Sequence, residues 1–201
     1  MKISYVTVGD YQTNCYVLEE KGHYLIIDPG SRYKKILTLL PEEGAVVDGI
    51  LLTHGHLDHI GAVDKLVSLF HCPVYISEAD MEMARNPRLN LSEYDPVVVN
   101  SKMTKIKEGR SHIGNFTVDT YETPGHTQGS LVFVIGNAMF SGDTLFHLSV
   151  GRTDLPTGSN SELRNSLKLL KNLDDSLEVY PGHDEITTLG FEKENNPFLI
   201  Y

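Results

Sequence analysis

The chain has 201 residues, and its 27 Asp and Glu residues against 17 Lys and Arg residues give a formal net charge of −10. This length suits one compact domain over residues 1–201, and a hydrophobic fraction of 40% with 22% charged residues excludes disordered and fibrous classes. The acidic balance disfavours nucleic acid as a partner, and apolar runs such as residues 131–135 fall far short of the roughly 18 residues that a membrane span needs.

The first third of the chain alternates between extended and helical patterns. Runs of β-branched and aromatic residues bounded by Gly, Pro and Asn predict strands, and apolar residues at helical spacing predict helices. We expect strands over residues 3–8, 15–18, 24–27, 49–53 and 74–77, and helices over residues 36–40 and 62–70.

Residues 78–100 have no clear period. The pairs Asn86-Pro87 and Asp95-Pro96 bracket what reads as an excursion over the surface, with a short helix over residues 78–86. Because long excursions are often functional, we expect a lid or substrate wall lined by Tyr94 or Met83, with a merely solvated insertion as the alternative.

The second half returns to strands. We expect strands over residues 116–120, 131–135, 138–141 and 177–180. A helix over residues 161–173 is marked at its start by Ser159 and Glu162, which have capping-box spacing. Many strands with helices interspersed and no strict βαβ alternation predict an α+β fold, in which two facing sheets form the core and helices lie outside.

Two segments resemble each other. Residues 25–30 and 138–143 are both apolar strands that end in Asp and Gly, and each is followed by a helix and by a strand that ends in a histidine-bearing turn. Two similar halves would place both sets of strand ends along one edge of the molecule.

The strongest local signal is Thr-His-Gly-His-Leu-Asp-His at residues 53–59. His54 and His56 are two apart and project from the same side of an extended chain, while Gly55 permits the tight turn that brings in Asp58 and His59. Neutral imidazole and carboxylate are ligands that Zn²⁺, Fe and Mn accept. The alternative is a solvated turn that is rich in histidine by chance.

Three later residues fit the same site, because each lies just past a predicted strand. His126 lies in a Gly-rich turn, Asp143 follows residues 138–141, and His183 follows residues 177–180. Taken singly, each has an ordinary explanation, such as a helix N-cap for Asp143. With the cluster they supply seven ligands, enough for two metals with open positions. We read the other histidines as surface or packing residues: His23, His71, His112 and His147.

The THxHxDH cluster, the PGHTxGS turn, the SGDTLF strand end and the PGH turn resemble the metallo-β-lactamase-fold hydrolases. Their order resembles the glyoxalase II (hydroxyacylglutathione hydrolase) branch, especially its short members, over nearly the whole chain. The resemblance implies an αββα four-layer sandwich. It also implies that His54, His56 and His126 hold one metal, that Asp58, His59 and His183 hold a second, and that Asp143 bridges them. Asp28 would orient a ligand imidazole.

The resemblance implies two divalent ions, with Zn preferred and Fe or Mn possible. Two metals that share a water lower its pKa from 15.7 towards about 7, so the resulting hydroxide needs no separate Ser or Cys nucleophile. Cys15 and Cys72 then read as buried apolar residues. Two cysteines and an N-terminal stretch without an apolar signal segment predict a cytoplasmic, reduced protein.

The substrate implied is a small thioester of the hydroxyacylglutathione type, or an ester. Residues 151–154 stand where the family has basic and tyrosine glutathione contacts; Arg152 keeps the positive charge and is the expected substrate contact, but Asp154 replaces the aromatic residue. Glu185 stands in place of another tyrosine, and we expect this protein to lack the C-terminal helical domain that helps to hold glutathione in the family. Two acidic replacements repel an anionic tripeptide. An ion pair between Arg152 and Asp154 is the alternative role for Arg152.

Other functions remain open at this point. A persulfide dioxygenase of the same fold uses one iron held by two histidines and a carboxylate, and an ester or lactone hydrolase uses the same attack on an acyl carbon. A secreted β-lactamase would need a signal peptide and usually lacks a residue like Asp143, and a nuclease would need a basic arm. From a different class, a metal-stabilised sensor or binding module would hold the ions without turnover.

Overall fold

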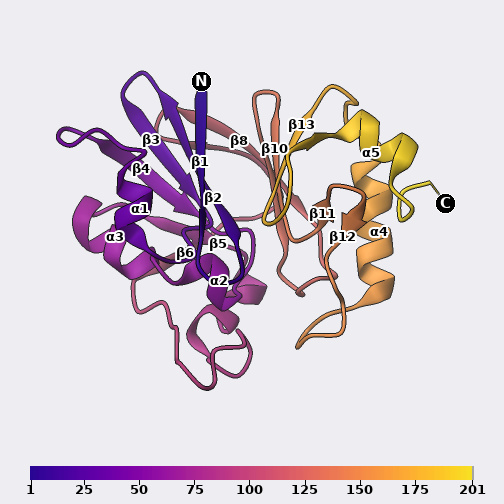
Figure 1. The fold of residues 1–201 in the computed structure, drawn as a ribbon, viewed down its shortest axis with the longest axis horizontal. Helices are drawn as coiled ribbons and strands as arrows, with labels where there is room; N and C mark the ends of the chain where they lie inside the picture. Colours follow the sequence, from indigo (N-terminus) through magenta and orange to yellow (C-terminus); the bar gives the residue numbers. More distant parts are fainter. Residues whose placement is uncertain (201) are drawn as a thin grey trace.

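The computed structural model describes residues 1–200. Two six-stranded sheets lie face to face, with helices on both outer sides (Figure 1). The first sheet has the order β1-β2-β3-β4-β5-β6, and its strands are β1 (Lys2–Val8), β2 (Thr13–Glu20), β3 (His23–Ile27), β4 (Val46–Leu51), β5 (Val74–Ile76) and β6 (Met103–Lys105).

The second sheet has the order β14-β13-β10-β9-β8-β7. Its strands are β7 (Gly109–Ile113), β8 (Phe116–Glu122), β9 (Leu131–Ile135), β10 (Ala138–Gly142), β13 (Glu178–Pro181) and β14 (Thr187–Thr188). A small hairpin of β11 (Leu145–Phe146) and β12 (Ser149–Val150) follows β10.

The two halves repeat one arrangement, as the two similar segments predict. In the first sheet β1, β2 and β3 are antiparallel neighbours, and β4 then pairs parallel with β3. In the second sheet β8, β9 and β10 are antiparallel neighbours, and β13 pairs parallel with β10. Because β4 and β13 hold equivalent places, their carboxyl ends and the turns that follow them meet at one edge.

Strand alternation explains the layers. On β3, Leu25 and Ile27 pack into a cluster shared with the second sheet, while Ile26 packs on the other side with helix residues. The cluster between the sheets also contains Phe133 and Phe140. A third cluster joins the outer face of the second sheet to two helices. Three cores between four layers make this the α+β, αββα sandwich that was predicted.

Helices α1 (Tyr33–Leu37) and α3 (Val63–Phe70) cover the first sheet, and α4 (Asn160–Leu170) and α5 (Leu189–Asn195) cover the second (Figure 1). The Ser159 hydroxyl caps α4 by accepting from the Glu162 N–H at 3.3 Å, as the capping-box spacing predicts. Across residues 1–200, no helix is long and apolar enough to cross a membrane.

The excursion at residues 78–100 has little regular structure. In place of the expected helix it has two short 3₁₀ helices, η1 (Glu78–Asp80) and η2 (Met83–Arg85). The prediction that Tyr94 or Met83 lines a substrate wall is wrong, because Tyr94 is fully exposed and Met83 is buried in the protein. Leu91, which is partly exposed, is the residue of this segment that reaches the cleft described below.

Candidate metal centre

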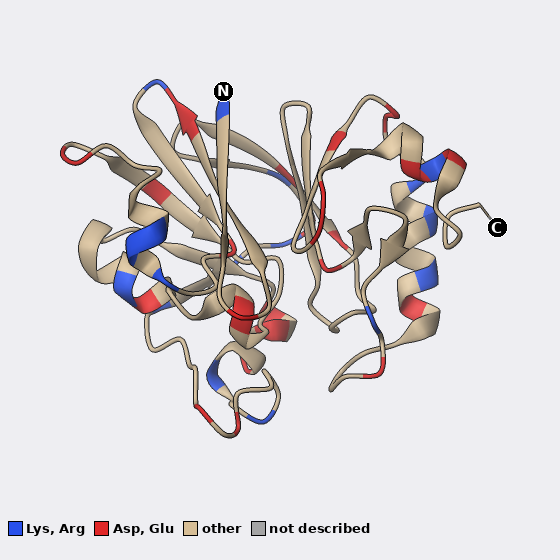
Figure 2. Cartoon of the chain, viewed as in Figure 1, with Lys and Arg blue, Asp and Glu red and all other residues tan. Residues whose placement is uncertain are grey.

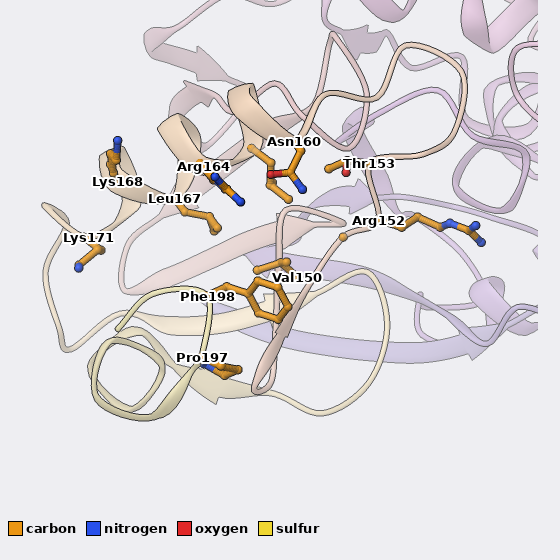
Figure 3. A pocket seen from close by; sticks show the side chains of 12 residues that line it. Val150, Arg152, Thr153, Asn160, Arg164, Leu167, Lys168, Lys171, Pro197 and Phe198 are labelled. Atoms are coloured by element: carbon orange, nitrogen blue, oxygen red, sulfur yellow. The ribbon is translucent and has the colours of Figure 1, made fainter. Parts of the chain in front are cut away.

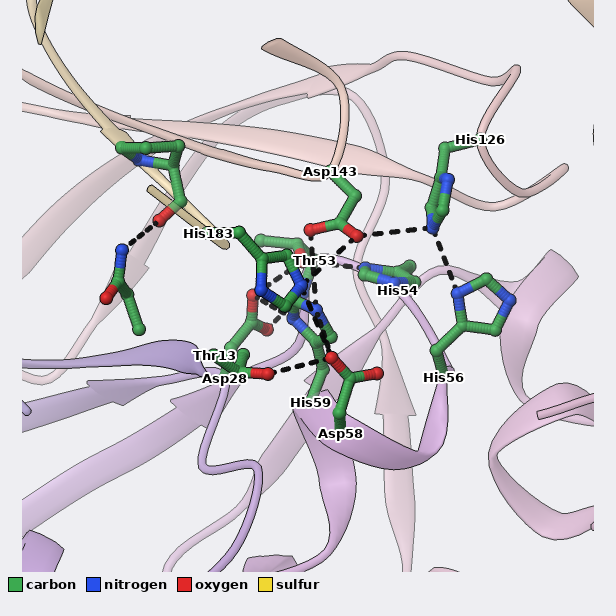
Figure 4. Close-up of polar contacts among 12 residues, drawn as sticks. Thr13, Asp28, Thr53, His54, His56, Asp58, His59, His126, Asp143 and His183 are labelled. Carbon is green, nitrogen blue, oxygen red and sulfur yellow. Dashed lines mark hydrogen bonds and ion pairs between the residues drawn. The ribbon is translucent and has the colours of Figure 1, made fainter. Parts of the chain in front are cut away.

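Four chain segments meet at the shared sheet edge and carry the candidate ligands (Figure 4). The turn after β4 holds His54 and His56, and the short helix α2 (Leu57–Ile60) that follows it holds Asp58 and His59. His126 lies in the loop between β8 and β9. The last two side chains follow directly on their strands: Asp143 after β10, and His183 after β13.

Gly55 allows this turn to pass close to the excursion. A Cβ atom on Gly55 would lie 3.0 Å from the backbone nitrogen of Ala84 and 3.0 Å from the side chain of Met83. His56 has an extended backbone and stands at the N-cap of α2, so the chain changes from strand-like to helical within two residues. This change is what brings Asp58 and His59 beside His54.

The structure brings all seven predicted ligands together. Their candidate donor atoms form overlapping groups within 4.8 Å of one another: His54 with His56 and His126, Asp58 with His59 and His183, and His54 with His59 and Asp143. Asp143 lies between the first two groups, since its Oδ2 is 3.4 Å from His126 Nε2 and 3.5 Å from His183 Nε2. This is the position that a bridging carboxylate requires.

Neighbouring oxygens fix the imidazole rings. His59 Nδ1 lies 2.9 Å from Asp28 Oδ2, His126 Nδ1 lies 2.8 Å from the Arg152 carbonyl oxygen, and His54 Nδ1 lies 3.1 Å from Thr53 Oγ1. Each of these contacts leaves Nε2 of the ring to face the centre. Such contacts set the tautomer and orientation of a metal-ligating histidine, and Asp28 makes the one that the resemblance implies.

Several buried atoms that face the centre make no hydrogen bond within the described residues: His54 Nε2, His59 Nε2 and Asp143 Oδ1. In addition, His56 Nδ1 and His126 Nε2 are 3.0 Å apart, so two ring nitrogens that both point inward face each other. Buried polar atoms without partners are costly, and a cation among these nitrogens and carboxylates would satisfy them. The residues therefore fit divalent metal ions.

The pKa values of the histidines differ between the two groups of candidate ligands. Burial and the nearby His126 lower the pKa of His56 to about 3, so this ring is neutral at physiological pH. Burial also opposes charge on His183, but Asp143 and Asp58 outweigh it and raise the pKa of His183 to about 10. For Asp58 the effect of burial is likewise outweighed, by His59, His183 and Thr13, and its pKa falls to about 2.

A cleft of about 550 Å³ opens onto the centre. Its walls beside the candidate ligands are mainly apolar, and include Tyr11, Leu57, Leu91, Phe146 and Leu155. Arg152 also lines the cleft, but its guanidinium is exposed and pairs with both oxygens of Asp154 at 2.7 Å. The ion pair that the sequence offered as the alternative role of Arg152 is therefore present, and contact of Arg152 with substrate stays a prediction.

Sequence reasoning missed Asp80. This residue is fully buried in the excursion, and its Oδ2 accepts hydrogen bonds from the Gly55 N–H at 3.0 Å and from Thr127 Oγ1 at 2.7 Å. It thus connects the turn that holds His54 and His56 to the loop that holds His126. No signal in the sequence marks it, since both partners are distant along the chain.

The histidines set aside from the sequence lie elsewhere. His147 is 3.1 Å from the buried Glu192, His23 is 2.8 Å from Asp48, and His112 contacts Thr117. Cys15 and Cys72 are buried and unpaired, as expected.

Comparison with known proteins agrees with this geometry. The chain is similar to the probable metallo-hydrolase YqgX of Bacillus subtilis, at 35% identity over 99% of this chain and 98% of the relative. It is also similar to the hydroxyacylglutathione hydrolase GloC of Haemophilus influenzae, at 32% identity over 99% of this chain and 98% of the relative.

Solved structures show the same likeness. The BLEG-1 B3 metallo-beta-lactamase has a TM-score of 0.92 and 36% identity, with both chains fully covered. TTHA1623 in a di-iron-bound form has a TM-score of 0.88 and 37% identity over 98% of this chain and all of that one. ETHE1 from Myxococcus xanthus has a TM-score of 0.81 and 27% identity over 98% of this chain and 84% of that one. The model of the metallo-beta-lactamase superfamily matches residues 8–183, and this chain therefore belongs to that superfamily.

Proposed function

We propose that the protein is a two-metal hydrolase that cleaves a small thioester of the hydroxyacylglutathione type. One observation carries this proposal: two groups of ligand atoms lie side by side, with Asp143 between them. A likeness to a hydroxyacylglutathione hydrolase over almost the whole chain supports the thioester as substrate.

In this proposal His54, His56 and His126 hold one ion, Asp58, His59 and His183 hold the other, and Asp143 contacts both. Two divalent ions supply an acidified water and polarise the carbonyl group of the substrate. Zinc suits this mixture of imidazole and carboxylate, and the di-iron form of TTHA1623 makes iron the alternative to test.

The protein's own residues position the substrate. The apolar walls formed by Leu57, Phe146 and Leu155 shield the acyl group from water, and Arg152 stands at the mouth of the cleft, where an anionic thiol portion would lie. Arg152 can engage that portion through Nη1, since only its Nε and Nη2 are paired with Asp154. Neither cysteine lines the cleft, so neither is placed to act as a nucleophile.

The test is steady-state hydrolysis of S-D-lactoylglutathione by zinc-loaded and iron-loaded protein, beside an Asp58→Ala variant. We expect kcat/KM of at least about 10⁴ M⁻¹s⁻¹ and a loss of more than about 100-fold in the variant. A protein that contains both metals and does not cleave this thioester, or any other thioester, ester or lactone, would refute the proposal.

A persulfide dioxygenase is the second candidate, because ETHE1 has the same fold at 27% identity. That enzyme class needs one iron and open coordination positions. Asp58 and His183 lie 3.3 Å apart and complete a second group of ligands here. Oxygen uptake by iron-loaded protein with glutathione persulfide, unaffected by Asp58→Ala, would favour this candidate over hydrolysis.

A β-lactamase is the third candidate, because BLEG-1 is 36% identical over its full length. The same attack on a carbonyl carbon would open a lactam ring. Hydrolysis of nitrocefin more efficient than that of any thioester would favour this candidate.

A further inference from the structure

A second pocket, of about 590 Å³, lies between α4, β12 and the segment just after α5. Figure 3 shows Val150 and Phe198 facing Leu167 of α4 across the pocket. Leu163 and Leu167 are buried and form the floor, whereas Phe198 is 55% exposed at the rim. The middle of the pocket is thus apolar.

The wall of this pocket is cationic. Arg164, Lys168 and Lys171 recur at four- and three-residue intervals, which places them on one side of α4 and its C-terminal end. No carboxylate lines the pocket among the described residues, and within that part of the chain none of these three cations is in an ion pair. These three cations gather on one side of a single helix in a chain whose net charge is −10 (Figure 2). Such a row attracts an anion.

The pocket adjoins the metal centre. Val150 and Arg152 line both this pocket and the cleft above the metals, and the Arg152 carbonyl accepts from the His126 ring at 2.8 Å. Residues 150–152 therefore form a ridge that one extended ligand can cross. Arg152 and Thr153 lie at one end of the pocket and Lys168 and Lys171 at the other (Figure 3). With a rise of 1.5 Å per residue, Lys171 lies roughly 10 Å beyond Arg164 along the helix.

A ligand that starts at the metals and crosses the ridge of residues 150–152 thus passes the apolar middle of the pocket and reaches Lys168 and Lys171 last. We propose that this pocket binds the thiol carrier of the substrate, and that the carrier is an uncharged arm that ends in phosphate groups, as in coenzyme A. This inference rests on the thioester hydrolysis of the proposed function and replaces its glutathione carrier by a phosphorylated one. Glutathione fits less well, because its charged carboxylates and ammonium are distributed along a short tripeptide and would face Val150, Leu167 and Phe198.

The test measures binding without turnover. Titration calorimetry of the metal-loaded protein with S-methyl-coenzyme A, S-methylglutathione and S-methylpantetheine uses thioethers that cannot be hydrolysed. We expect S-methyl-coenzyme A to bind at least about tenfold more tightly than either of the others, with an affinity that falls as salt rises. Equal or tighter binding of S-methylglutathione would overturn the assignment.

Variants locate the site. Arg164→Gln and Lys168→Gln remove charge and keep good helix formers on the exposed side of α4. The double variant Lys34→Gln/Lys107→Gln removes two exposed lysines that lie outside this pocket and is the matched control. The double variant Arg164→Gln/Lys168→Gln should weaken S-methyl-coenzyme A binding by about tenfold or more and leave S-methylpantetheine unchanged. Equal effects of the control and of Arg164→Gln/Lys168→Gln would refute the site.

The two proposals fail in different ways. If the protein binds S-methyl-coenzyme A through α4 but cleaves no thioester, the proposed function falls and the pocket stands. If it cleaves lactoylglutathione at full rate but binds no coenzyme A thioether, the pocket assignment falls and the function stands.

Discussion

Asp80 and Thr127 are 47 residues apart in sequence, and their side chains are joined by a 2.7 Å hydrogen bond inside the protein. The same carboxylate oxygen accepts the Gly55 N–H. A Cβ atom on Gly129 would lie 2.5 Å from Asp80 Oδ1, so the loop around His126 packs directly against this carboxylate. One buried side chain thereby sets the distance between the two loops that carry His54, His56 and His126.

Replacing Asp80 should disturb the first metal group and leave the second in place. Asp80→Asn keeps the size of the side chain but replaces one oxygen by an N–H₂ group. That group either takes the place of Oδ2, which accepts both hydrogen bonds, or lies in the place of Oδ1 against the Gly129 backbone. We expect metal affinity at the His54, His56 and His126 group to fall about 10- to 100-fold, as for other residues that support metal ligands. Metal content after dialysis against a weak chelator should drop from two ions to one.

The matched control is Asp64→Asn. Asp64 accepts hydrogen bonds from the backbone of Asn100 and Ser101 and lies outside the metal centre. Retention of both ions in Asp80→Asn, or equal loss in the control, would show that Asp80 does not position these ligands.

Asp28 should support the second group of candidate ligands, which contains His59, as Asp80 supports the first. Its carboxylate accepts from the Thr53 N–H at 2.8 Å and the Thr53 hydroxyl at 2.6 Å, and it holds His59 Nδ1 at 2.9 Å. In Asp28→Asn at least one of these donors loses its acceptor inside the protein. We expect the metal-free protein to lose about 1–3 kcal/mol of unfolding free energy, measured by urea denaturation.

The same variant should also bind its second metal more weakly, which competitive chelator titration measures. An unchanged second-site affinity together with lower stability would mean that Asp28 supports only the fold.

The candidate ligands could be recognised in the sequence, whereas the residues that position them, such as Asp80, could not. His54, His56 and His183 are recognisable because a strand end followed by a tight turn places a side chain at the sheet edge, and strands are readable from local pattern. Asp80 lies in a segment with no period, and its role depends on two partners that only the folded chain brings near. The helix Leu189–Asn195 and the strand Met103–Lys105 were missed because each is short, and the capping Thr188 does not by itself mark a helix.

Metal binding should release protons at the group that contains His183 and not from His56 in the other group. Asp143 and Asp58 outweigh burial and raise the pKa of His183 to about 10, so in the metal-free protein this ring is protonated at pH 7. A metal must displace that proton. Affinity at this group should therefore rise with pH, by up to about tenfold per unit for each proton, until the pH approaches 10. His56, with a pKa of about 3, has no proton to lose to a metal at pH 7.

Calorimetric titration with Zn²⁺ in buffers of different ionisation enthalpy measures this release. We expect one binding step with a strong dependence on buffer and one with a weak dependence. His183→Ala should remove the strong dependence together with the second site. Two binding steps with equal dependence on buffer would contradict the predicted difference in proton release between the two groups of ligands.

Gly125 should be the most sensitive glycine of the His126 loop. Its φ is +144°, and a Cβ atom would lie 2.4 Å from the backbone nitrogen and Cα of Leu163 at the start of α4. Its carbonyl oxygen accepts the Ser159 N–H at 2.8 Å, so the loop rests on the helix N-terminus and neither side can yield easily. Gly125→Ala should therefore cost more than about 2 kcal/mol of unfolding free energy, through backbone strain and a clash with backbone atoms.

Gly44→Ala is the control, because Gly44 has a φ of +77° but no atom within 4 Å of an added Cβ. Only backbone strain of about 1 kcal/mol is expected there. Urea denaturation of the metal-free proteins compares the two variants, and the difference reports the clash with Leu163 together with the greater backbone strain at a φ of +144° than at +77°. Because the loop carries His126, Gly125→Ala should also lose metal at the first group, whereas Gly44→Ala should keep both ions. Equal stability of the two variants would show that the loop and α4 can move apart, and that the position of His126 is not fixed by this contact.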